Sequence, residues 1–118
     1  MTDPVAIAAR AAAQRLESGD SARLAVEVEA ALAARETEER RQQYIDPVSI
    51  GSLLVALASL AWTVYRDLRK KTDSPAPEAV ARTVRVRLRE DGQELPDGRV
   101  IEVVVDETIR AGAQNEAT

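Results

Sequence analysis

The side chains that could carry chemistry in this chain are carboxylates, guanidiniums and hydroxyls, because its 118 residues include no histidine and no cysteine. Ser–His and Cys–His nucleophile pairs are therefore impossible, as are the usual zinc sites and any disulfide. The net charge of −4 argues against a nucleic-acid-binding surface, which would be strongly basic. The composition predicts a non-enzymatic protein with no cofactor, no metal ion and no nucleic-acid partner.

Three charged groups remain as candidate sites, and each has a simpler explanation. The loop 91–98 holds acidic residues and glycines, but it lacks the spacing of a calcium-binding loop, so turn formation accounts for it. The run 35–41 mixes glutamates with arginines, as on a solvated helix face. Arg85, Arg87 and Arg89 could bind phosphate or acidic lipid, yet cross-strand pairing with acidic residues explains them as well.

Three serines and one threonine lie within a single uncharged run, from Val48 to Tyr65. Small and hydroxyl-bearing residues recur there at a spacing of three and four, which places them on one stripe of a helix. Such a stripe lets helices pack closely in a membrane, and it could alternatively line a narrow pore formed by several copies. We assign to helix self-association, and so to a homo-oligomer, the following residues: Ser49, Gly51, Ser52, Ala56, Ser59 and Thr63.

The element that must carry this stripe is a hydrophobic helix over residues 46–71. At 1.5 Å per residue its uncharged run spans about 27 Å, close to the ~30 Å of a bilayer's hydrocarbon layer. Insertion of a single copy is near balance, so a helix buried at the centre of a soluble oligomer stays open as the alternative. Aromatic and basic residues flank the run as at a membrane interface with lipid: Tyr44, Trp62, Tyr65, Arg66, Arg69, Lys70 and Lys71.

Residues 1–45 predict an Ala-rich, amphipathic helical arm. Asp3 and Pro4 suit the start of a first helix, and Gly19 suits its end. A second helix follows from Ala22 into the charged run. The chain has no phenylalanine, and its few aromatic residues predict a thin core, because large side chains bury far more apolar area than alanine does.

The remaining chain is predicted to hold a Pro-containing linker over 72–82, a β-hairpin module over 83–110 and a tail over 111–118. Apolar and charged residues alternate along 84–89 and 99–106, on both sides of a turn-rich loop. The predicted register pairs Arg87 with Glu102 and Glu90 with Arg99. An isolated hairpin is marginally stable, so its apolar face should dock onto a partner: Val84, Val86, Leu88, Ile101, Val103 and Val105. The expected fold class is mainly α with a C-terminal β-hairpin.

The order of these elements resembles the effector-associated constant component proteins of bacterial conflict systems. The likeness covers residues 48–106: a Leu/Ala helix, a basic stop, then Val84-Arg85-Val86-Arg87-Leu88 and Arg99-Val100-Ile101-Glu102-Val103. In that family the small protein is a non-enzymatic partner coded beside proteases or NTPases, so the resemblance implies an effector protein of that kind as a partner. The Ala-rich arm, and the lack of a predicted helix after the hairpin, depart from the family pattern.

The expected function is that of a membrane-anchored adaptor, whose helix anchors and self-associates and whose hairpin docks a partner. The basic flank predicts a place in the bacterial inner membrane with the C-terminus in the cytoplasm, although a polar N-terminal arm would then have to cross. Two alternatives are a membrane-permeabilising effector of the holin or toxin kind, and a soluble, cytoplasmic structural subunit that buries the helix in an assembly.

Overall fold

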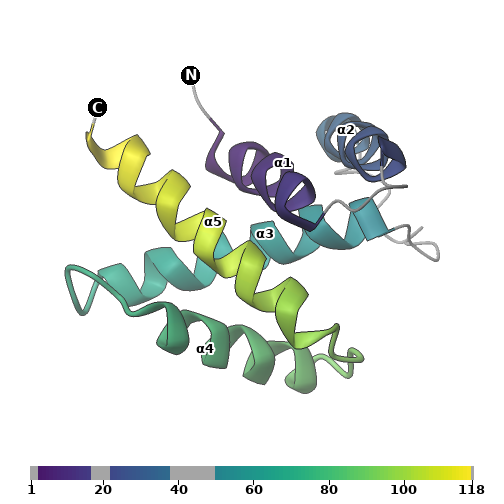
Figure 1. Cartoon of the computed structure of the whole chain (residues 1–118). Coiled ribbons are helices and arrows are strands. Elements are labelled where there is room, and N and C mark those ends of the chain that lie inside the picture. The colour runs from purple at the N-terminus through teal and green to yellow at the C-terminus, as the bar shows by residue number, and fades with distance from the viewer. Residues whose placement is uncertain (1–2, 17–21, 38–49, 118) are drawn as a thin grey trace.

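The computed structural model describes residues 3–16, 22–37 and 50–117, and within these ranges the chain forms helices and no strand. The helices are α1 (Pro4–Leu16), α2 (Ala22–Thr37), α3 (Ile50–Arg69), α4 (Pro77–Glu90) and α5 (Gly98–Ala117). Helix α3 contacts each of the other four. Helix α5 crosses α3, with α1 along one side of the crossing and α4 along the other (Figure 1).

Helix α1 is part of the bundle rather than an arm. Asp3 begins it as predicted, because its Oδ1 accepts a hydrogen bond of 3.0 Å from the Val5 amide. One face of the helix is made of alanines and is fully buried against α3 and α5. The composition had predicted a thin core, because alanine buries little apolar area. Small side chains, however, let helix axes approach closely, so the alanines contribute to this core by close packing. The alanines are Ala8, Ala9, Ala12 and Ala13.

The predicted membrane-spanning helix is wrong. None of the described helices is both long enough and apolar enough to cross a bilayer. The start expected at residues 46–49 lies outside the described residues, and α3 is described from Ile50. Its large apolar side chains, such as Leu54, Leu57 and Val64, are buried by the chain's own helices. The hydroxyl-bearing stripe makes the segment amphipathic, and an amphipathic helix buries its apolar face in a protein core.

The predicted β-hairpin over 83–110 is also wrong, because both of its proposed strands lie within helices. Val80, Ala81 and Val84 are buried on one face of α4, at helical spacing. Val86 was expected on the same face as Val84, but its side chain is 42% exposed. The pairs Arg87–Glu102 and Glu90–Arg99 therefore belong to no sheet, and Arg87 instead forms an ion pair of 3.1 Å with Asp67 of α3.

Helix α5 buries β-branched residues at a spacing of three and four, which include Ile101, Val104, Val105 and Thr108. Such residues are weaker helix formers than alanine or leucine, so packing against α1, α3 and α4 outweighs their local preference. The segment predicted as a frayed tail, 111–118, continues this helix as far as Ala117.

The loop between α4 and α5 confirms that turn formation explains its composition. Gly92 has a φ of 75°, in the left-handed region that glycine adopts without strain. The amide of Gln93 donates to the Leu88 carbonyl at 2.9 Å, which closes α4 as a Schellman motif does. Asp97 then begins α5, since its Oδ1 accepts a 2.8 Å hydrogen bond from the Arg99 amide.

Candidate functional site

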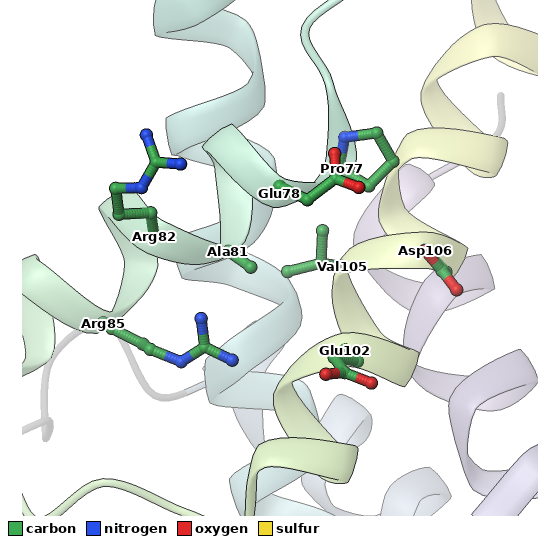
Figure 2. Close-up of a pocket in the computed structure, with 8 residues that line it drawn as sticks. All are labelled: Pro77, Glu78, Ala81, Arg82, Arg85, Glu102, Val105 and Asp106. Carbon is green, nitrogen blue, oxygen red and sulfur yellow. The ribbon is translucent and has the colours of Figure 1, made fainter.

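A groove of about 410 Å³ lies between α4 and α5. Figure 2 shows that α4 forms one wall of the groove and α5 the other. Its lining joins charged side chains of both signs to a short apolar floor: Pro77, Glu78, Ala81, Arg82, Arg85, Glu102, Val105 and Asp106.

The helical repeat places the charged residues on the two walls. On α4, Glu78, Arg82 and Arg85 lie four and three residues apart, so they share one side of the helix. On α5, Glu102 and Asp106 lie four residues apart and share a side in the same way. The α4 wall is therefore mainly basic and the α5 wall is acidic.

The floor of the groove is apolar, and it is where the two helices meet. Ala81 and Val105 are both buried, and their side chains point toward one another (Figure 2). Because alanine is small, α5 can come close to α4 at this level, while the longer charged side chains stand on both sides of the contact. The groove therefore results from how α4 and α5 cross, and its rims carry the charged side chains.

Most charged side chains of the groove have no ion-pair partner in the part of the chain that the structure describes. Among the described residues, no ion pair within 4 Å involves Arg82, Arg85 or Glu102. Asp106 does have a neighbour, since its Oδ2 lies 3.5 Å from Nη1 of Arg15. Glu78 has no ion pair among the described residues either, so two guanidiniums and two carboxylates remain available to a ligand that carries complementary charge.

A second charged cluster holds α1 against α5, and the sequence reasoning missed it. The side chain of Glu107 is only 7% exposed, and its Oε2 lies 3.1 Å from Arg15 and 3.4 Å from Arg110. A buried carboxylate needs such partners, because removing its charge from water costs free energy. Two carboxylates, Asp106 and Glu107, directly follow the apolar run 103–105, and they were the available signal. This cluster is closed, so its role is structural.

The predicted self-association stripe is split between two environments. Gly51 is buried against α2, where its amide donates to Oε1 of Glu27 at 3.1 Å. The other described residues of the stripe are partly or fully exposed along α3: Ser52, Ala56, Ser59 and Thr63. The Ser59 and Thr63 hydroxyls donate to carbonyls four residues earlier in the same helix, at 3.1 Å each. Ser49 lies outside the described residues.

The aromatic residues assigned to a membrane interface form an internal stack. The Trp62 and Tyr65 rings are 5.7 Å apart between centroids and lie over Gly112 of α5. Arg69 donates to the Tyr65 hydroxyl at 3.2 Å, and its guanidinium is 5.9 Å from the ring centroid. Exposed basic residues surround the C-terminal end of α3, where they complement the helix dipole: Arg66, Lys70 and Lys71. Tyr44 is not among the described residues.

The predicted docking face is the inner face of the bundle. Its buried members are Val84, Ile101, Val103 and Val105, whereas Leu88 is partly buried and Val86 is exposed. The sequence reasoning treated Arg85, Glu102 and Asp106 as strand residues, with Asp106 diagonal to Arg85, and did not single out Arg82. Helical spacing within 82–85 and 102–106 was the signal that would have found both walls.

Nothing in the described part of the chain gathers three or more acidic, histidine or cysteine side chains around a possible metal site. No protein-family model, no curated protein and no solved structure matches the chain.

Proposed function

We propose that this chain is a non-enzymatic adaptor, and that it binds protein partners through the groove between α4 and α5. The single observation that supports this is the pair of charged walls, whose arginines and Glu102 have no ion-pair partner in the described chain. Complementary charges across an interface fix the register of two proteins and exclude wrong partners.

The charge pattern favours a protein over a nucleic acid. A nucleic-acid backbone carries negative charge throughout, so it would be attracted by Arg82 and Arg85 but repelled by Glu102 and Asp106. A protein surface carries both signs and can match both walls. The apolar floor at Ala81 and Val105 adds a small contact area that excludes water.

A first class of partner to test is the one that the sequence resemblance implied, a protease or an NTPase coded beside this protein. The adaptor needs no membrane anchor. The membrane-permeabilising alternative depended on a spanning helix, and the subunit alternative depended on an α3 that other chains would bury. Helix α3 is instead covered by α1, α2, α4 and α5 of its own chain.

The proposal is tested by site-specific photo-cross-linking in cells that make the full chain. A photo-reactive amino acid replaces Arg82 in the groove, and in the matched control it replaces Arg66, which is exposed on α3 outside the groove. We expect a discrete protein adduct from position 82, lost when Glu102→Arg is added, and none from position 66. Equal adducts from both positions, or none from position 82, would contradict the proposal.

A further inference from the structure

This inference rests on the proposed function and names an occupant of the groove. We infer that the groove binds a second copy of this chain, face to face, about a two-fold axis that runs along the groove between α4 and α5. The basic wall of one copy then lies against the acidic wall of the other.

The arrangement follows from how a two-fold axis exchanges the walls. An axis along the groove brings α4 of one copy opposite α5 of the other, so Arg85 faces the partner's Glu102. Symmetry repeats this pair, so the dimer contains it twice. An axis across the groove would instead bring α4 opposite α4, and arginine opposite arginine. Charge complementarity therefore favours the axis along the groove over the axis across it.

Apolar contacts are available in the same place. The apolar part of the groove is its floor at Ala81 and Val105, beside Pro77. Arginine side chains have long apolar stems, which can cross the open groove and cover the floor at Ala81 and Val105. The second copy thus meets charge at the rims and apolar atoms at the centre.

The size of the surface predicts a weak dimer. Helix α4 has 14 residues and so is about 21 Å long, and two adjacent helices are roughly 20 Å wide. The resulting face of about 400 Å² is smaller than the ~800 Å² per partner of a standard stable interface. Because its pairs are exposed to solvent, added salt should weaken the dimer further.

The test is sedimentation velocity on the full chain at about 200 μM, in low salt and in salt of about 0.5 M, where the ions screen exposed charges. We expect a dimer in low salt that dissociates in high salt. Arg85→Glu and Glu102→Arg should each raise the dissociation constant at least about tenfold, because each places like charges opposite one another. Arg66→Glu makes the same charge change outside the groove and should leave the dimer intact.

Mixing the two single variants gives the decisive result. In a mixed dimer each reversed charge meets its opposite, so Arg85→Glu with Glu102→Arg in equal amounts should form a heterodimer that neither forms alone. The same two changes in one chain should also restore the dimer, which controls for misfolding of a single variant. A parent that is monomeric in low salt, or a mixture that forms no heterodimer, would overturn the inference. If position 82 still cross-links to a different protein, the proposed function stands; without that adduct both fail.

Discussion

Two helix pairs in this molecule meet in opposite ways. Helices α2 and α3 are closed on one another at Gly51, where an added Cβ would lie 2.6 Å from the Glu27 carbonyl carbon and would also overlap the Glu27 Cβ. Helices α4 and α5 touch at a floor of Ala81 and Val105 and leave a groove of about 410 Å³ beside it. The difference lies in what surrounds each contact: the glycine lets α2 and α3 close completely, whereas long charged side chains flank the Ala81–Val105 contact and keep a groove open beside it.

This difference separates a structural contact from a binding surface. The α2–α3 contact satisfies its polar groups internally, since the Glu27 carboxylate accepts the Gly51 amide near the start of α3. The α4–α5 groove leaves charged groups for another molecule. Substitutions at the first contact should therefore change stability without changing binding, and substitutions at the second should do the reverse.

The largest expected effect is at Gly51. Within an exposed helix Gly→Ala stabilises by about 1 kcal/mol, because alanine is the better helix former. Here Gly51→Ala should lower the free energy of unfolding by about 2–3 kcal/mol, since the methyl overlaps backbone atoms of α2 that cannot move aside. Urea denaturation followed by circular dichroism measures it. Gly98→Ala is the control, because no atom lies within 4 Å of the added methyl. Equal stability of Gly51→Ala and the parent would show that α2 does not pack on α3 there.

The closed charge cluster between α1 and α5 should give the next largest effect. Arg15→Ala leaves the buried Glu107 carboxylate with only the longer contact to Arg110, so we expect a loss of about 1–2 kcal/mol. The estimate stays below that for a fully buried pair because the Arg15 side chain is 40% exposed. Arg110→Ala, at a side chain 68% exposed, should cost less than about 0.5 kcal/mol. Equal losses in the two variants, measured by urea denaturation, would contradict this assignment.

A substitution in the groove should hardly change the free energy of unfolding in the same denaturation experiment. Arg85 has no ion-pair partner within the described chain, so Arg85→Glu should change the free energy of unfolding by less than about 0.5 kcal/mol. A loss above about 1 kcal/mol would mean that Arg85 holds the two helices together. The contrast between the two helix pairs would then disappear.

The smallest effect concerns the link between α1 and α2. The hydrogen bond from Arg10 Nε to Oε2 of Glu29, at 2.7 Å, lowers the pKa of Glu29. Because the folded pKa lies below the unfolded value, this link stabilises the fold above the unfolded pKa, and the stabilisation is lost as pH falls through the folded pKa. Arg10→Gln should raise the pKa of Glu29 toward its ordinary value, as seen by NMR titration. Arg23→Gln, which removes a pair with Glu27 instead, should leave that pKa unchanged. A Glu29 pKa that does not respond to Arg10→Gln would rule out the link.

Local signals in the sequence predicted where several helices begin or end, but not what those helices pack against. The Asp3–Pro4 start, the helix from Ala22 and the turn at 91–98 depend on backbone chemistry within a few residues, and the structure has each of them. The environment of the uncharged run 48–65 depends on distant residues. The same leucines suit a bilayer or a protein core, and only the folded chain brings the alanine face of α1 against them.

The groove could not be predicted because the period of two short segments was misread. Val84, Val86 and Leu88 alternate with arginines, and so short a run fits a strand as well as a helix. The deciding residues precede the run, since Val80 and Ala81 extend the apolar face with a helical repeat. Once both segments are helices, Arg82 and Arg85 lie on one wall of the groove and Glu102 and Asp106 on the other, with Arg85 directed toward Glu102 (Figure 2).

The central claim is that residues 77–90 and 98–117 are two helices that meet at Ala81 and Val105, because the groove and both proposals depend on that arrangement. Its most direct test is NMR assignment of the full chain, with Cα secondary shifts and NOEs between methyl groups. The account predicts helical shifts throughout both segments and an NOE between the Ala81 and Val105 methyls. Extended shifts over 84–89 and 99–106, with cross-strand NOEs between Arg87 and Glu102, would contradict it.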